Sequence, residues 1–320
     1  MLSDNPSRQR SGRLEEISLG HVPLVSVGIP TYNRSDSLRR TLSCIAQQTY
    51  KNLEIIVSDN NSQDSTESVV QEFISLDNRI RYYRQPENIG PANNFKFVLE
   101  KATGEYFMWA ADDDEWSDNF IEVCLNKLNR LGENYVAAIT EAQYFTESGK
   151  LDFFSEGQPF YDFFSPNVTS RMIRMLKYNY GNLYYSLFRR QSLYDKGQSI
   201  FECLDFSSLN EIPLFLFVSQ QGNWVVLPAV GLFKKTTTST YEQAKWEKVG
   251  GKLPNSQRPG YYKSLSSNFK YHELARRDIF QVIDHLNLSP IGKAKLKFIS
   301  FYLLLKHFGC FVAKRKKRAF

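Results

Sequence analysis

Three consecutive carboxylates, Asp112, Asp113 and Asp114, follow a short apolar run and are the residues of the chain most suggestive of chemistry. Adjacent carboxylates repel one another, so holding three of them together is costly unless a cation compensates their charge. Oxygen ligands suit Mg²⁺ or Mn²⁺, which proteins usually bind through one or two carboxylates while substrate phosphates complete the shell. The run therefore favours a divalent ion and a nucleoside diphosphate; the alternative is a solvated turn before the next helix.

Three other polar segments follow apolar runs in the same way, and they come earlier in the chain. They are Pro30 to Arg34, Ser58 to Asp64 and Glu87 to Gly90. In open α/β sheets, ligands bind outside the carboxyl ends of the strands. If each apolar run is a parallel strand, all four polar segments converge on one crevice, which favours a binding site.

The sequence between these segments alternates β-rich runs with helical patterns, which is typical of βαβ units and a mainly parallel sheet. The helical patterns begin at Asp36, at Asp64 with Glu67 in a capping box, at Pro91 with Gly104 as the stop signal, and at Asp118. The second half is less regular. Strands are expected at 24–29, 53–57, 79–84, 105–110, 135–145, 183–188 and 224–234, and further helices at 168–178, 211–220 and from about 264 onward.

Composition excludes several classes of protein. The chain has 320 residues, 42% of them hydrophobic, which is enough for a substantial core and excludes dominant disorder. Its net charge is +6, but nine basic and no acidic residues lie between His285 and Phe320. The charge excess is therefore confined to one tail, so no nucleic-acid partner is expected. The four widely spaced cysteines indicate a reducing compartment rather than a zinc site or a disulfide scaffold.

Two common enzyme classes are excluded by missing motifs. A dinucleotide-dependent oxidoreductase requires a glycine-rich turn after the first strand, and Pro30 to Arg34 contains no glycine. A P-loop enzyme requires the Gly-x4-Gly-Lys-Ser/Thr motif, which the sequence does not contain.

In order and spacing, four segments resemble the family 2 glycosyltransferases. They are VSVGIPTYNR at 25–34, IVSDNNSQD at 56–64, NIG at 88–90 and DDDEW at 112–116. The resemblance covers Pro23 to Leu131 well and continues more weakly to about Tyr241. It implies an α/β GT-A fold with a mainly parallel central sheet flanked by helices. It also implies an inverting transfer of a sugar from a UDP- or dTDP-sugar to a saccharide or lipid-linked acceptor, in prokaryotic cell-surface polysaccharide assembly.

The resemblance also implies roles for individual residues. A carboxylate at Asp59 would accept the N3 proton of uracil or thymine and select these bases, since cytosine leaves that site unsatisfied. Asp113 is the first metal ligand, with Asp114 in support, and the cofactor is Mn²⁺ or Mg²⁺. Ala111 stands where many family members carry another Asp. The implied nucleotide-sugar contacts are Pro30, Thr31, Tyr32, Arg34, Asp59, Asn88, Gly90 and Asp112.

An inverting transfer needs a base that takes the proton of the acceptor hydroxyl. The segment 210–214 resembles the family's stretch in which an acidic pair opens a helix, and Glu211 aligns with the base. The pair is Asn-Glu here rather than Glu-Asp, so Asp205 is the alternative. Ala111 and this altered pair also keep open a rival interpretation, a scaffold subunit that retains the fold without turnover.

The expected organisation is a disordered leader at 1–21, a catalytic domain at 22–262 and a helical basic tail at 263–320. The catalytic domain divides into a nucleotide-sugar-binding half, 22–132, and an acceptor half, 133–262. The leader is polar and lacks the apolar stretch of a secretory signal, which indicates a cytoplasmic protein.

From about Pro290 the tail combines lysines, an apolar run with residues such as Phe298, Ile299, Phe301 and Leu303, and five consecutive basic residues at 314–318. This pattern is typical of a helix lying on an anionic membrane surface, here the inner face of the cell membrane. A helix packed on the catalytic domain with a solvated basic end is the other interpretation. The apolar run is shorter than the roughly 20 residues that span a bilayer.

Overall fold

The structure is a computed structural model of the 320-residue chain. It describes residues 21–146, 149–150, 165–178, 182–203, 211–235 and 268–316. The expected leader therefore lies outside the described residues, apart from His21.

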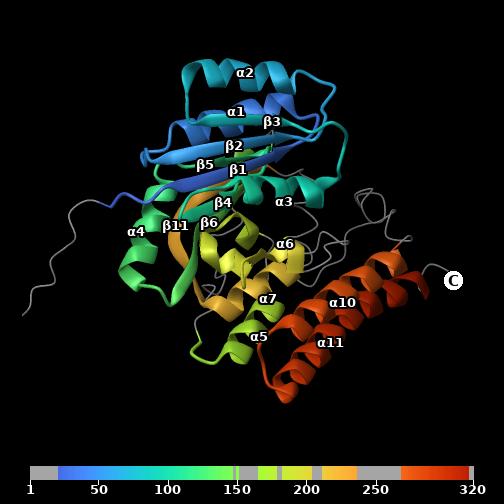
Figure 1. Cartoon of the computed structure of the whole chain (residues 1–320). Coiled ribbons are helices and arrows are strands. Elements are labelled where there is room, and N and C mark those ends of the chain that lie inside the picture. The colour runs from blue at the N-terminus through green and yellow to red at the C-terminus, as the bar shows by residue number, and fades with distance from the viewer. Residues whose placement is uncertain are drawn as a thin grey trace, which may run out of the picture.

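A mainly parallel sheet forms the centre of the molecule (Figure 1). Strand β1 pairs in parallel with β2 and β4, β2 with β3, and β6 with β11, whereas β8 and β5 run antiparallel to their neighbours. The strand order is β3-β2-β1-β4-β8-β6-β11-β5, and β7 pairs with β6. The strands are β1 (Val25–Thr31), β2 (Leu53–Asp59), β3 (Ile80–Arg84), β4 (Tyr106–Trp109), β5 (Asp114–Trp116), β6 (Tyr135–Thr146), β7 (Gly149–Lys150), β8 (Leu187–Arg189) and β11 (Asn223–Lys235), with a separate pair, β9 (Tyr194–Asp195) and β10 (Gln198–Ser199).

Helices flank this sheet, and the last two lie together beyond α5 and α7 (Figure 1). They are α1 (Ser35–Ala46), α2 (Thr66–Leu76), α3 (Pro91–Lys101), α4 (Phe120–Leu131), α5 (Val168–Tyr178), α6 (Ile200–Cys203), α7 (Ile212–Gln221), α10 (Asn268–His285) and α11 (Pro290–Lys316), with short 3-10 turns at η1 (Asn182–Tyr185) and η2 (Arg190–Leu193). The expected fold class, a mainly parallel sheet flanked by helices, is confirmed.

The burial of hydrophobic residues explains why the sequence pattern predicted the central strands and the helices. All seven residues of β1 and all seven of β2 are buried, as expected for central parallel strands covered on both faces. Such strands read as continuous apolar runs. Helix α4 buries the residues that its helical spacing placed on one face, namely Phe120, Ile121, Cys124, Leu125 and Leu128.

Three local signals were misread. The capping box at Asp64 does not form: its carboxylate accepts the backbone N–H of Thr66, and Glu67 pairs with Arg84. Helix α4 begins after Asn119 rather than after Asp118. The expected strand at 183–188 is a 3-10 turn followed by the short strand β8.

The helical tail packs against the rest of the chain through its first half. Helix α10 contacts α7, and α11 contacts α5. Ile279, Val282 and Ile283 of α10 and Leu296 of α11 belong to the same hydrophobic core as the sheet. Within the part of the chain that the structure describes, no helix combines the length and apolarity needed to cross a bilayer.

A buried carboxylate holds the amino-terminal edge of the sheet together. Oε1 of Glu54 on β2 accepts hydrogen bonds from the Ser26 hydroxyl (2.6 Å), from the backbone N–H of Thr103 (2.6 Å) and from that of Gly104 (3.2 Å). A Cβ on Gly104 would lie 2.6 Å from the carbonyl oxygen of Leu24, so this glycine permits a close approach of two chain segments instead of ending α3, which stops at Lys101. Burial raises the pKa of Glu54, but these hydrogen bonds outweigh it and the net pKa is lowered.

Replacing Glu54 by Gln should lower the free energy of unfolding by about 2 kcal/mol at neutral pH, because a charged acceptor of buried hydrogen bonds becomes a neutral amide. The folded-state pKa is depressed, so this stabilisation is present above the unfolded pKa of about 4.3 and is lost as pH falls through the folded value. Thermal denaturation between about pH 7 and pH 3 should show the Tm difference closing as pH falls.

A matched control for this prediction is Glu100→Gln. Glu100 forms an exposed pair with Lys96 on α3, and such pairs contribute little to stability. Equal Tm losses in the two variants would contradict the role assigned to Glu54.

Candidate active site

The carboxyl ends of the parallel strands meet at one edge, as the polar segments predicted. Thr31, the last residue of β1, is opposite Asp59 on β2, and Asp59 is opposite Arg84 on β3. Side chains from the loops beyond these ends contact one another. The Thr31 hydroxyl donates to Asp112 (2.8 Å), and the Asn60 amide donates to Asn88 (2.9 Å).

A buried asparagine that the sequence analysis missed ties this edge together. Nδ2 of Asn94, in the first turn of α3, donates to the backbone oxygen of Ser58 (3.0 Å) and to that of Thr31 (3.4 Å). Its Oδ1 accepts the Ser58 hydroxyl. Asn94 thereby fixes the ends of β1 and β2 relative to each other. The only available sequence signal was an Asn pair inside a helical pattern, where asparagine is unfavourable.

Two of the chain's own cations offset part of the charge of the three carboxylates. Arg34, just after β1, forms an ion pair with Asp113 and a longer one with Asp112 (3.5 Å). Lys234 of β11 forms an ion pair with Asp114. Burial raises the pKa of Asp112 to about 6, even though Arg34 and the Thr31 hydrogen bond oppose the shift. These contacts supply part of the compensating charge that the sequence analysis assigned to a metal ion.

Asp114 and Asp113 differ sharply in their access to solvent. Asp114 is only 2% exposed, because β5 pairs with β11 and places it opposite Lys234. The Lys234 ammonium also lies 4.2 Å from the centre of the Tyr185 ring, a cation–π contact. The Asp113 side chain is 41% exposed. Of the two predicted metal ligands, Asp113 is thus open to a ligand, whereas Asp114 is held beneath Lys234.

The carboxylates of this site fit a divalent ion only if most of the ion's ligands come from the substrate and from water. Across the described residues, no group of three or more His, Cys, Asp or Glu side chains has a metal-binding arrangement. Asp113, with Asp112 beside it, suits an ion that completes its shell with diphosphate and water oxygens. Arg34 would then have to release Asp113.

The predicted nucleotide pocket contains both open and buried residues. Tyr32 is exposed, whereas Pro30 is buried within β1 and shapes the backbone. Asn88 accepts the N–H of Gly90 (2.9 Å), and Gly90 adopts a positive φ of 80° at the start of α3. These two residues therefore form the turn that leads into the helix. Whether they also contact a donor stays a prediction.

Asp59, the predicted base-selecting residue, is fully buried. Its Oδ1 accepts the backbone N–H of Ser62 (2.8 Å), and its Oδ2 accepts the Tyr82 hydroxyl (2.7 Å). Burial and the hydrogen bond to Asp59 raise the pKa of Tyr82 well above its ordinary value. Asp59 stabilises the turn after β2. A hydrogen bond from a nucleobase to Asp59 would have to form in addition to those from Ser62 and Tyr82.

Glu211, the first candidate for the base, precedes the first residue of α7. Burial raises the pKa of Tyr185 well above its ordinary value, and the charges of Asp114, Asp113 and Glu211 raise it further. Glu211 therefore lies within electrostatic range of the same tyrosine as the carboxylate run. The alternative base, Asp205, lies outside the described residues. No sequence pattern had marked Tyr185.

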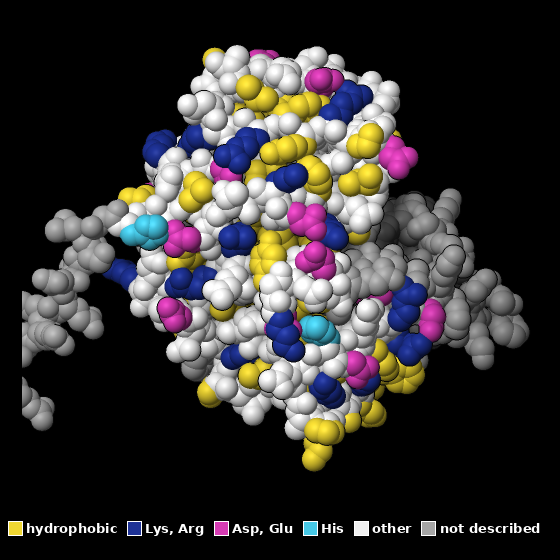
Figure 2. Space-filling model, in the orientation of Figure 1, with side chains coloured by type: hydrophobic (Ala, Val, Ile, Leu, Met, Phe, Trp, Pro, Cys, Tyr) yellow, Lys and Arg dark blue, Asp and Glu magenta, His cyan; other side chains and the backbone are white. Residues whose placement is uncertain are grey.

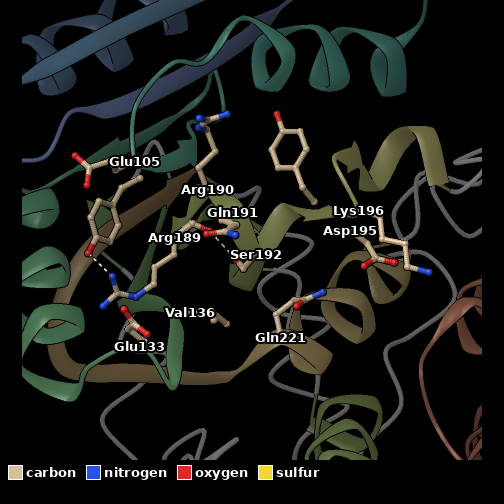
Figure 3. A pocket seen from close by; sticks show the side chains of 12 residues that line it. Glu105, Glu133, Val136, Arg189, Arg190, Gln191, Ser192, Asp195, Lys196 and Gln221 are labelled. Atoms are coloured by element: carbon tan, nitrogen blue, oxygen red, sulfur yellow. Dashed lines mark hydrogen bonds between the residues drawn. The ribbon is translucent and has the colours of Figure 1, made fainter.

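A separate groove of about 800 Å³ lies at the opposite, amino-terminal edge of the sheet (Figure 3). It includes none of the predicted site residues. Arg189, which lines it, donates to the Tyr106 hydroxyl (2.6 Å) and to the backbone oxygen of Tyr135 (3.0 Å). Arg190 donates to the backbone oxygen of Gly104. Both arginines therefore join strands and loops at this edge.

Comparison with known proteins identifies relatives of part of the chain. The family model described as Glycosyl transferase family 2 matches residues 26–195. A GalNAc(5)-diNAcBac-PP-undecaprenol beta-1,3-glucosyltransferase of Campylobacter jejuni is 40% identical over 109 residues, 34% of this chain and 35% of that protein. Glycosyltransferase GlyA of Streptococcus pneumoniae is 32% identical over 148 residues, 45% of this chain and 20% of that protein. The matched segments thus span about a third or less of these relatives.

Solved structures show the same fold at low sequence identity. Residues 1–349 of TarS from S. aureus superpose with a TM-score of 0.61 at 15% identity, covering 87% of this chain and 70% of that one. The same fragment in complex with UDP-GlcNAc gives 0.56 at 15% identity, covering 87% and 71%. The mannosyltransferase PcManGT from Pyrobaculum calidifontis, in complex with GDP-Man and Mn²⁺, gives 0.53 at 16% identity, covering 88% and 70%.

Substituting Lys234 by Met should lower the free energy of unfolding by about 3 kcal/mol, because it removes the ammonium that faces a deeply buried carboxylate. Arg34→Met should cost less than about 1 kcal/mol, since its partner Asp113 is exposed to solvent. Urea unfolding of both variants measures the difference. If Lys234→Met is as stable as Arg34→Met, the ion pair between Lys234 and Asp114 does not stabilise the fold as proposed.

Proposed function

The chain belongs to glycosyl transferase family 2, and from this premise we propose that it transfers a sugar from a UDP- or dTDP-sugar to a saccharide or lipid-linked acceptor, with inversion. The observation that carries the proposal is the meeting of Arg34, Asp112 and Asp113 at one sheet edge. The structural relatives solved with UDP-GlcNAc and GDP-Man support a nucleotide-diphospho-sugar donor. The undecaprenol-linked substrate named for the Campylobacter relative supports a lipid-linked acceptor.

Arg34 is the residue best placed to hold the donor diphosphate. Its guanidinium is half-exposed and already occupied by carboxylate oxygens, and its planar donor groups match phosphate oxygens equally well. When the diphosphate arrives, Arg34 exchanges Asp113 for phosphate. A divalent ion held by Asp113 would neutralise the charge that develops on the leaving diphosphate.

Glu211 completes the reaction from the acceptor side. Its carboxylate takes the proton of the acceptor hydroxyl as that oxygen bonds to the anomeric carbon. The bond between the anomeric carbon and the diphosphate oxygen breaks, and its electron pair leaves with the diphosphate. Attack from the face opposite the diphosphate inverts the anomeric carbon.

The reaction belongs at the cytoplasmic face of the membrane, where a lipid-linked acceptor and a nucleotide-sugar are both accessible, in prokaryotic cell-surface polysaccharide assembly. The lipid-linked substrate of the Campylobacter relative supports this setting. The family membership of the chain supports sugar transfer in general, and the donor sugar is to be found by experiment.

A scaffold that binds the nucleotide-sugar without turnover is the second candidate. It is favoured by Ala111 and by the ion pairs that already offset part of the charge of the three carboxylates. Screening UDP- and dTDP-sugars with Mn²⁺ for acceptor-dependent diphosphate release separates the two candidates. Release with one donor establishes the enzyme, whereas binding without release establishes the scaffold.

Asp113→Asn should abolish most sugar transfer and weaken the dependence on Mn²⁺, because it removes the open carboxylate ligand of the ion. The variant should retain the wild-type Tm, since Asp113 is exposed. Steady-state kinetics over a range of Mn²⁺ concentrations measure the effect. Glu115→Gln, an acid two residues away that pairs with Arg40, is the matched control and should remain active. Normal turnover of Asp113→Asn at saturating Mn²⁺ rejects the assignment.

Glu211→Gln should lower kcat by about 10²- to 10⁴-fold, the usual contribution of a general base, and leave the Kd for nucleotide nearly unchanged. Transfer kinetics and calorimetric titration with UDP or dTDP give the two quantities. Glu202→Gln, on the neighbouring helix α6, is the control and should behave as wild type. An active Glu211→Gln together with an inactive Asp205→Asn would assign the base to Asp205.

A further inference from the structure

The beginning of α11 has two faces of different character. Ile291, Phe298, Phe301 and Tyr302 are between 44% and 82% exposed. Their spacing of seven, ten and eleven residues from Ile291 places them on one side of a helix. Leu296 and Ser300 on the other side are buried. The exposed side is called the outer face of α11 below.

The inner face is fixed by packing, so the outer face cannot turn inward. Helix α11 contacts α10 and α5, and Ile299 and Leu303 pack against the hydrophobic core. A Cβ on Gly292 would lie 3.2 Å from the Thr169 hydroxyl, which indicates how closely α11 approaches α5. The expectation that Ile299 and Leu303 enter a membrane was therefore wrong, because the structure uses both in the core.

Such a concentration of exposed large apolar side chains is unusual. Elsewhere among the described residues, the exposed large hydrophobic side chains are Val22, Tyr32, Leu76 and Val230, which come from four different segments. Single exposed apolar residues are ordinary, whereas a contiguous group marks an interaction surface. Figure 2 shows hydrophobic side chains along the lower right edge of the molecule, where α10 and α11 lie in Figure 1, beside Lys and Arg and some acidic side chains.

Helix α11 itself carries basic and no acidic side chains. Lys295 is exposed four residues after Ile291, on the same side. Lys293 and Lys297 flank it, and both contact Asp284 of α10. The sequence from His285 to the end contains no acidic residue, and five consecutive basic residues stand at 314–318.

We infer that the outer face of α11 docks on an anionic lipid surface. Its four exposed apolar side chains enter the boundary between headgroups and acyl chains. Lys295 contacts the anionic headgroups. Aromatic and aliphatic side chains with lysines and no acids are the composition that such a boundary selects. The inference concerns attachment and goes beyond sugar transfer, since it depends on the surface of α11 and not on the carboxylate site.

The experiment is flotation of the full chain with phosphatidylcholine vesicles, with and without phosphatidylglycerol. Wild type should rise with the anionic vesicles and more weakly at high salt. The double variant F298E/F301E should partition about tenfold or more weakly, because two apolar anchors become like-charged with the lipid. Leu76→Glu is the matched control: Leu76 is 79% exposed on α2, and this variant should float as wild type.

A second variant, in which lipid binding produces a new signal, distinguishes loss of lipid binding from loss of folding. Phe298→Trp should be quenched by brominated phosphatidylglycerol more strongly than wild type, because the new indole enters the acyl boundary. Absence of added quenching, or flotation of F298E/F301E equal to wild type, overturns the inference. It is also overturned if wild type fails to float but forms a dimer that F298E/F301E dissociates, since the face is then an interface between copies.

Failure of the inference and failure of the proposed function are separable. Transfer to a water-soluble acceptor should be the same in F298E/F301E as in wild type. A chain that floats with lipid but transfers no sugar contradicts only the proposed function, whereas an active chain that ignores lipid contradicts only the docking.

Discussion

The site depends on the compensation of three like charges that follow β4, part of which the chain's own cations supply. Arg34 arrives from the loop after β1, and Lys234 arrives from β11 through the pairing of β11 with β5. Segments that are far apart in the sequence therefore supply the cations that lie beside these carboxylates. Only the complete sheet brings these cations to the acidic run, so the charge distribution of the site is a property of the folded chain.

The two ion pairs have different physical consequences because their exposure differs. The pair between Lys234 and Asp114 is shielded from water, so separating it leaves a buried charge at high cost. The pair between Arg34 and Asp113 is open to solvent and therefore contributes little to stability. At Asp114 the ion pair is therefore buried and stabilises the fold, whereas at Asp113 the ion pair is exposed and its carboxylate is accessible.

Local patterns predicted the parallel strands, most helices and the meeting of four polar segments, because burial of central parallel strands and amphipathic helices produces apolar residues at characteristic spacings. They could not predict β5, whose residues belong to the acidic run and become a strand only by pairing with β11. The pairing of Asp114 with Lys234 and the hydrogen bonds of Asn94 are contacts between distant segments. The inner and outer faces of α11 likewise follow from packing on α5 and α10, which the apolar run alone did not reveal.

The packing of the last helices connects the two proposals physically. Glu211 stands at the start of α7, and the far half of α7 contacts α10: Phe217 stacks on the ring of His285 at 6.2 Å. Just beyond α10, the backbone N–H of Asn287 donates to Gln220 (2.5 Å). Helix α11 in turn packs on α10 and α5. If both proposals hold, a lipid surface that binds the outer face of α11 would also orient α7 and, at its start, Glu211, so that a lipid-linked acceptor would reach the proposed base from a defined direction.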